Sequence, residues 1–171
     1  MIKRPQPDEY SAFAARYVDL VGDEPILEIL KENQQSTYEI FSRISANKAG
    51  YAYAEGKWTI KQVLGHMADT ERVFAYRALA FSREAVELPS FDQDVYMEGA
   101  TFNDRTLTDL ANEFKTVRES SLYLFKSLTE NQSTQKGIAS GNPVSVRALA
   151  YMIAGHELHH IKILKERYLV G

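Results

Sequence analysis

Apolar residues recur at intervals of three and four along most of the chain, which is the spacing of one face of an α-helix. Stripes of this kind predict helices over residues 8–22, 25–44, 59–83, 106–128 and 145–164. We find no sustained alternation with the period of two that marks a half-buried strand, so the sequence predicts no strand. Five helical segments, four of them long, predict an all-α protein: a four-helix bundle with an additional N-terminal helix, in a single domain spanning residues 1–171.

Local signals mark the starts of two helices. Thr59 and Gln62 have the spacing of a capping box, and Ser145 is a candidate N-cap of the last helix. Residues 130–143 read as a polar turn region. Residues 84–105 show no sustained period, and a connection of that length in a compact domain is usually functional or disordered. Its aromatic residues favour an ordered loop folded over something else.

Composition excludes several classes of protein. The formal net charge of −3 argues against non-specific binding of nucleic acid. The chain has no cysteine, which excludes disulfides, a thiolate nucleophile and a cysteine-based zinc site, and which fits a reducing cytoplasm. It has neither an apolar run of the length that spans a membrane nor a signal-peptide pattern. We therefore expect a cytoplasmic protein that binds neither nucleic acid nor a membrane.

The histidines carry the chemistry. His156 and His160 lie one helical turn apart, and they replace apolar residues in the middle of a core stripe. Two buried imidazoles lose hydration together and repel each other when protonated, and a shared metal ion removes both problems. His66 lies at the edge of the apolar face of another helix. We predict that His66, His156 and His160 bind one divalent metal ion; the alternative for His66 alone is a core histidine with one satisfied hydrogen bond.

Three neighbouring residues are candidates to support these ligands. Asp69 follows His66 by one turn and could orient it or add a carboxylate oxygen, although a solvated surface acid is an equal alternative. Glu71 could act in the same way if it turns inward. His159 is rotated away from the line of His156 and His160, which favours a surface, supporting or interface role over direct ligation.

One competing motif overlaps the histidine cluster. Residues His156 to His160 match H-E-x-x-H, the helix signature of zinc metalloproteases, in which Glu157 would be the general base. Those enzymes take a third ligand from downstream of the motif, and only eleven residues follow His160. The sequence also predicts no strand that could present a peptide substrate, so we disfavour the interpretation as a metalloprotease.

Three segments together resemble the DinB/YfiT-like family of small metal-dependent four-helix-bundle proteins, and the resemblance covers essentially the whole chain. They are Tyr10 with Tyr17–Val21, Lys57–Thr59 with Leu64–Glu71, and Gly155–Ile161. The resemblance implies that His66, His156 and His160 bind a divalent ion, commonly zinc or nickel, and that the protein is a homodimer. Family members include transferases of low-molecular-weight thiols, thiol-dependent isomerases and proteins described as hydrolases.

Three protein ligands leave a coordination position open, which is the arrangement of a catalytic metal. Acting on a small molecule, such an enzyme could transfer a low-molecular-weight thiol cosubstrate to an electrophile, or hydrolyse its substrate with metal-bound hydroxide. A non-catalytic metal-binding protein is the third hypothesis. The connection over residues 84–105 would cover the pocket. Candidate pocket residues are Asp92, Asp94 and Tyr96, with Arg77 or Arg83 to hold a carboxylate.

Overall fold

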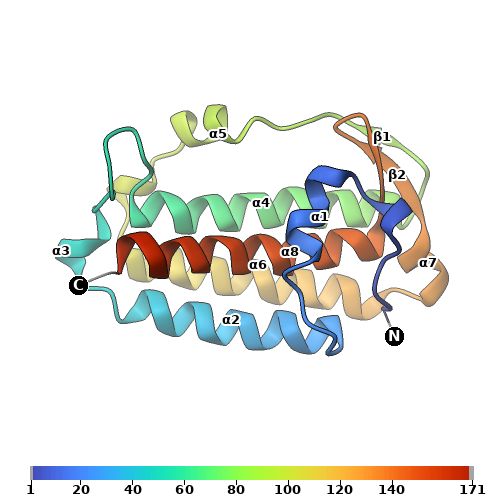
Figure 1. Ribbon diagram of the computed structural model, residues 1–171, viewed down its shortest axis with the longest axis horizontal. Helices are drawn as coiled ribbons and strands as arrows, with labels where there is room; N and C mark the ends of the chain where they lie inside the picture. The colour runs from blue at the N-terminus through green and yellow to red at the C-terminus, as the bar shows by residue number, and fades with distance from the viewer. Residues whose placement is uncertain (1, 170–171) are drawn as a thin grey trace.

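Four long helices form the body of the protein, whose computed structural model describes residues 2–169 (Figure 1). Each of α2 and α4 contacts both α6 and α8, so the order around the bundle is α2, α6, α4, α8. The predicted four-helix bundle is therefore confirmed. Among the described residues, no helix combines the length and the apolar character needed to cross a bilayer. The long helices are α2 (Ile26–Ser42), α4 (Ile60–Phe81), α6 (Leu107–Ser127) and α8 (Val146–Ile163).

The predicted helix starts are confirmed. The Thr59 hydroxyl accepts a hydrogen bond from the Gln62 backbone N–H at 3.2 Å, and the Gln62 side chain accepts from the Thr59 N–H at 2.9 Å. These two bonds satisfy N–H groups that the first turn of α4 leaves without helical partners. Ser145 caps α8 by accepting from the Ala148 N–H at 3.0 Å. The start of the helix that carries the histidine cluster is thus set locally.

The N-terminal segment differs from the single helix predicted over residues 8–22. It forms a 3₁₀ turn, η1 (Pro7–Glu9), and then the short helix α1 (Ala12–Val18), which packs across α8. Gly155 permits this crossing, because a Cβ at that position would lie 1.9 Å from the Tyr17 carbonyl oxygen. The absence of a side chain at Gly155 therefore lets α1 approach the middle of α8, where the histidines lie.

The prediction of no strands is wrong. A small three-stranded sheet lies at one end of the bundle, with β2 antiparallel to β3 and β1 parallel to β2. Strands of two to four residues are too short to show alternation along the sequence. The turn between β2 and β3 has positive φ at Ser140 (55°) and Gly141 (73°), the geometry of a tight hairpin, for which glycine is favoured. The strands are β1 (Glu87–Leu88), β2 (Lys136–Ala139) and β3 (Asn142–Ser145).

The connection over residues 84–105 contains more regular structure than its sequence showed. It holds β1, helix α5 (Gln93–Gly99) and the 3₁₀ turn η2 (Phe102–Asp104). Phe102 is buried against α4, and a Cβ on Gly65 would lie 2.5 Å from its ring. This contact fastens the connection to α4 one residue before His66. The remaining short elements are α3 (Ala46–Ala49), α7 (Glu130–Thr134) and the π-helical turn η3 (Leu164–Tyr168).

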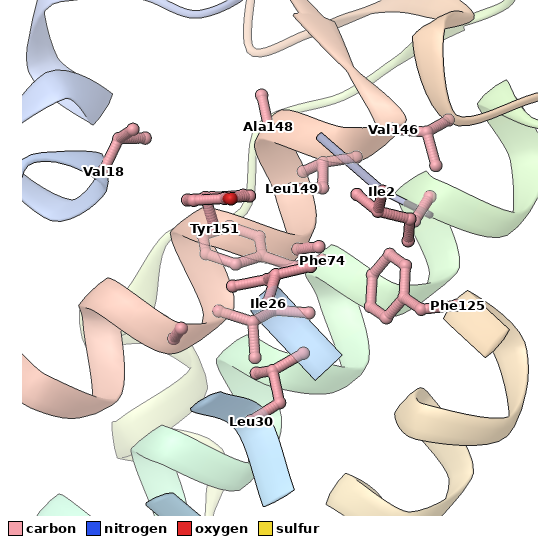
Figure 2. Close-up of a cluster of buried hydrophobic side chains, with 14 of the residues drawn as sticks. Ile2, Val18, Ile26, Leu30, Phe74, Phe125, Val146, Ala148, Leu149 and Tyr151 are labelled. Carbon is pink, nitrogen blue, oxygen red and sulfur yellow. The ribbon is translucent and has the colours of Figure 1, made fainter. Parts of the chain in front are cut away.

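The core consists of two apolar clusters separated by a buried polar layer. One cluster, drawn in Figure 2, lies towards the sheet and includes Leu30, Phe74 and Phe125. The other includes Phe41 and Phe114. Between them, each long helix contributes buried polar residues, an unusual arrangement because buried polar groups need partners. The layer contains Gln34, Thr37, Thr70, Glu71, Arg118, Ser121, His156 and Glu157.

Candidate metal centre

Three imidazoles from two helices meet beside this polar layer, to which His156 belongs. His66 Nε2 on α4 and His160 Nε2 on α8 each lie 3.1 Å from His156 Nε2. The ligand nitrogens of the three residues all lie within 4.8 Å of one another. Nitrogens bound to one tetrahedral zinc ion at about 2.0–2.1 Å would be roughly 3.3 Å apart. Two of the three nitrogen pairs thus lie at about the separation that a shared ion requires, and the third pair lies within 4.8 Å.

The donor set itself fits a cation. A ring nitrogen carries either one proton or one lone pair, so His156 Nε2 cannot make two full hydrogen bonds, one to each neighbouring imidazole. Three lone pairs directed at one ion satisfy all three nitrogens together. The Thr70 hydroxyl lies 3.5 Å from His66 Nδ1, where it can accept the Nδ1 proton and leave the Nε2 lone pair free. Thr70 lies one turn after His66, at the spacing that could have predicted this role.

Aromatic rings hold the imidazoles in place. The Trp58 ring lies 4.6 Å from the His66 ring, and the Tyr17 ring makes edge contacts with the rings of His156 and His159 at 5.4 and 5.6 Å. Trp58 comes from the segment just before α4, and Tyr17 from α1. The crossing of α1 at Gly155 therefore places an aromatic wall beside the candidate ligands.

Burial keeps these histidines neutral. It lowers the pKa of His66 to about 4 and, with smaller contributions from the charges of neighbouring groups, the pKa of His160 to about 3. Burial and the adjacent imidazoles also hold the pKa of His156 well below its ordinary value. A neutral imidazole is the form that binds a metal. The site therefore needs no deprotonation before it binds an ion near pH 7.

These pKa values predict that zinc affinity changes little between pH 7 and pH 5. Protons compete only when the pH approaches the pKa of the metal-free ligands, which lies near 4 or below for His66 and His160. If the three imidazoles had the ordinary pKa of about 6.5, protonation of each one would lower the zinc affinity of the site about thirty-fold by pH 5. Equilibrium dialysis at a fixed free zinc concentration, followed by elemental analysis, measures the difference. A titration with its midpoint near pH 6.5 would contradict the prediction.

A cavity of about 510 Å³ opens beside the candidate centre. His66 and His156 line it, and the space is large enough for a small molecule. Much of the remaining wall is apolar. It comes from α1, α4, α8, the hairpin and the connection before α5, and includes Phe74, Phe91, Val144, Leu149 and Met152.

The supporting residues predicted near the ligands are placed differently. Asp69 pairs with Arg72 at 3.1 Å, on the outer side of α4. His159 is half-buried and contacts the Tyr17 and His160 rings, but the ligand group of described residues does not include it. Glu71 is buried and faces Arg118, at 2.8 Å. Neither acid belongs to that ligand group, which contains the three histidines alone.

Arg118 contacts two buried acids, Glu71 and Glu157, close to the histidines. Its side chain is fully buried, bonds both carboxylate oxygens of Glu71 at 2.8 and 2.9 Å, and donates to the Leu30 carbonyl at 2.8 Å. Arg118 Nη1 also lies 2.8 Å from Glu157 Oε2, an ion-pair contact without hydrogen-bond alignment. Burial raises the pKa of Glu157 above its ordinary value despite Arg118. Because Glu157 faces Arg118 and does not line the cavity, the structure does not place it as a metalloprotease base.

Of the predicted pocket residues, Arg77 lines the cavity. Asp92 caps α5 by accepting from the N–H groups of Asp94 and Val95, and Asp94 itself is exposed. Tyr96 is also exposed and packs on Phe91, at 5.3 Å between ring centroids. The cavity is lined by none of Asp92, Asp94, Tyr96 and Arg83. Sequence reasoning missed most of the residues that do line it, among them Arg16, Tyr17, Phe91 and Gln93.

The fold and the site together define the class of this protein: it is a four-helix bundle in which three histidines form a candidate metal centre beside a cavity. The sequence model of the DinB superfamily matches residues 29–164, and the chain belongs to that superfamily. It is 28% identical over 147 residues to the "Putative metal-dependent hydrolase OB0413" of Oceanobacillus iheyensis, covering 83% of this chain and 84% of that protein.

Solved structures share the fold. YfiT from Bacillus subtilis, described as a probable metal-dependent hydrolase, has a TM-score of 0.71 at 15% identity, covering 96% of this chain and 91% of that one. The mycothiol-dependent maleylpyruvate isomerase has a TM-score of 0.67 at 13% identity, over 84% of this chain and 61% of that one. The DinB-like protein YjoA from Bacillus subtilis has a TM-score of 0.59 at 23% identity, over 82% and 87%.

Proposed function

We propose that this protein is a metal-dependent enzyme that transfers a low-molecular-weight thiol to an electrophilic small molecule. His66, His156 and His160 would hold a divalent ion, zinc or nickel, since imidazole suits both. The observation that carries the proposal is that two of these histidines line the cavity, so that a molecule bound there would lie beside the centre. Three protein ligands with one open position is the arrangement of catalytic zinc.

The cavity wall favours a thiol over water as the nucleophile. The ion would lower the pKa of whichever nucleophile it binds. A thiol starts from a pKa of about 8.5 and water from a far higher one, so water depends far more on a general base. Within residues 2–169, no aspartate or glutamate lines the cavity, and Glu157 is held by Arg118. The chain has no cysteine, so the thiol would be a second substrate.

The comparisons supply a precedent for thiol chemistry on this fold. The mycothiol-dependent isomerase is, by its name, an enzyme that depends on a small thiol. In this chain, the same fold places a cavity of about 510 Å³ against the histidines. Its apolar wall would exclude water from the reacting groups, which protects a thiolate and its electrophile from side reactions.

Hydrolysis is the second candidate function. It is favoured by the description of a curated relative and of YfiT as metal-dependent hydrolases. In that case, water in the cavity would take the place of the thiol. The two reactions share the metal centre and differ in whether turnover requires an added thiol.

The deciding experiment uses protein purified without a nickel column and loaded with zinc or nickel. It is assayed with 1-chloro-2,4-dinitrobenzene and, in turn, glutathione, cysteine, coenzyme A and mycothiol. We expect conjugation above the uncatalysed rate that requires both the metal and one of the thiols, and that a chelator abolishes. Cleavage of 4-nitrophenyl acetate without any thiol would support the hydrolase instead. A metal-loaded protein inactive in both assays would contradict both candidates.

A further inference from the structure

The largely apolar wall of the cavity carries positive charge, although the protein as a whole is acidic. The chain carries 23 acidic and 20 basic residues, yet in the part that the structure describes two arginines, Arg16 and Arg77, line the cavity and no acid does. Fixed positive charge in a partly apolar cleft raises the local concentration of anions. The wall is therefore biased towards a negatively charged small molecule.

Arg77 is the more informative of the two arginines. Arg77 is only 6% exposed, and among the described residues no carboxylate lies within 4.0 Å of its guanidinium. Its Nη2 donates to the Pro89 carbonyl at 2.8 Å and to the Ser140 hydroxyl at 3.3 Å, both neutral acceptors. A buried guanidinium without an anionic partner is costly. The guanidinium also lies over the Phe91 ring, at 5.8 Å from its centroid, but no anion neutralises its charge, which is therefore available to a ligand in the cavity.

Helical spacing aligns Arg77 with the metal centre. His66, Thr70, Phe74 and Arg77 follow one another at intervals of four, four and three residues on α4, and all four line the cavity. This row of side chains runs from the candidate metal ligand His66, past the apolar ring of Phe74, to the guanidinium of Arg77. Met152 and Leu149 of α8 also line the cavity. A molecule with an apolar body and one anionic end matches this order of surfaces.

We propose that Arg77 binds the carboxylate of the electrophilic substrate and directs the apolar, reactive part of that molecule towards His66 and His156. A planar guanidinium pairs with a carboxylate through two parallel N–H bonds, which fixes orientation as well as position. Gln93 and Asn142, which also line the cavity, offer neutral polar groups beside it. This inference rests on the proposed function for the reaction itself, but carboxylate binding can be measured without turnover.

The test measures binding of phenylacetate, and of its neutral analogue phenylacetamide, to the zinc-loaded full chain by isothermal titration calorimetry. We expect phenylacetate to bind with a dissociation constant on the order of 1 mM. Arg77→Gln should weaken phenylacetate by at least about tenfold and phenylacetamide hardly at all. Arg77→Lys keeps the charge without the planar fork and should fall between. The matched control is Arg83→Gln, which changes an exposed arginine just beyond the C-terminal end of α4 and should bind as the wild type does.

Equal binding of acid and amide by the wild type, or wild-type phenylacetate affinity in Arg77→Gln, would overturn the inference. A role for Arg77 confined to holding Pro89 and Ser140 would weaken the acid and the amide alike. If Arg77→Gln does not fold, the same comparison in Arg77→Lys decides. Repeating the titration after metal removal separates the two proposals. If phenylacetate binding depends on Arg77 but the wild type shows no metal-dependent reaction, this inference stands and the proposed function is rejected. If the wild type shows the metal-dependent reaction but phenylacetate binding does not depend on Arg77, only the role of Arg77 is rejected.

Discussion

Replacing His156 by alanine is expected to abolish stoichiometric metal binding and, with it, the metal-dependent reaction. His156 Nε2 is the nitrogen that lies 3.1 Å from both His66 and His160, so its loss leaves two ligands that do not contact each other as closely. Loss of an outer partner of a ligand already lowers metal affinity by about 10–100-fold, and loss of a direct ligand should exceed that. Elemental analysis of protein purified without a nickel column measures the change.

The matched control is His159→Ala, three residues further along the same helix. Its ring contacts Tyr17 and His160, but it does not belong to the ligand group, so this variant should keep its metal. Circular dichroism should show both variants folded, since metal loss from an unfolded chain would say nothing about ligation. Wild-type metal content in folded His156→Ala protein would contradict the three-histidine centre, as would loss of the metal from His159→Ala alone.

Replacing Arg118 by methionine is expected to lower the free energy of unfolding by about 3–5 kcal/mol. Arg118 is fully buried and is the cation that faces both Glu71 and Glu157. Its removal leaves two acids in the core without a counter-charge and leaves the Leu30 carbonyl without its donor. Urea denaturation of the metal-free protein measures the loss without the added stability that bound metal would give.

Two comparisons show whether charge causes this loss. Arg72→Met removes an arginine whose side chain is 46% exposed and pairs with Asp69 and Glu113, and it should cost less than about 1 kcal/mol. Adding Glu71→Gln and Glu157→Gln to the Arg118 variant should recover part of the stability, because the uncompensated charges are gone. Equal losses in the Arg72 and Arg118 variants would contradict the assignment.

The pH dependence of the Arg118→Met variant follows from the same network. Burial raises the pKa of Glu157, so this side chain takes up a proton at a higher pH than an exposed glutamate does. A buried neutral acid costs less than a buried carboxylate. The difference in stability between the variant and the wild type should therefore shrink as the pH falls from 7 towards 5. A difference that grows over that range would show that the acids are not the cause.

The polar layer shows why some site residues were predictable and others were not. His156 and His160 stand in an apolar stripe at helical spacing, so the sequence alone marked them as a pair. Around His66, the sequence prediction named Asp69, one turn away, as a supporting carboxylate and did not include Thr70. Asp69 points to Arg72, whereas the Thr70 hydroxyl faces the imidazole. A difference of one residue rotates a side chain by about 100° around a helix.

The cavity wall could not be predicted in this way. Residues 91–94 are consecutive, but only Phe91 and Gln93 line the cavity. Asp92 caps α5 and Asp94 is exposed. That pattern depends on where the connection folds back over α4. The small sheet was missed for a related reason: strands of two to four residues gain their stability from pairing, and β1 and β2 are almost fifty residues apart along the chain.

Periodicity and spacing, read along the chain alone, determined the helical class, the ends of the main helices and the histidine pair on one face, because these depend on residues within a turn or two of each other. Only the tertiary structure decided that His66 meets that pair, that Glu157 turns to Arg118, and that Arg77 shares a cavity with the metal centre. These outcomes depend on how α1, α4 and α8 pack, at contacts such as the one between Gly155 and Tyr17. Packing joins residues far apart in sequence, and no local pattern records the rotation that each helix takes when it packs.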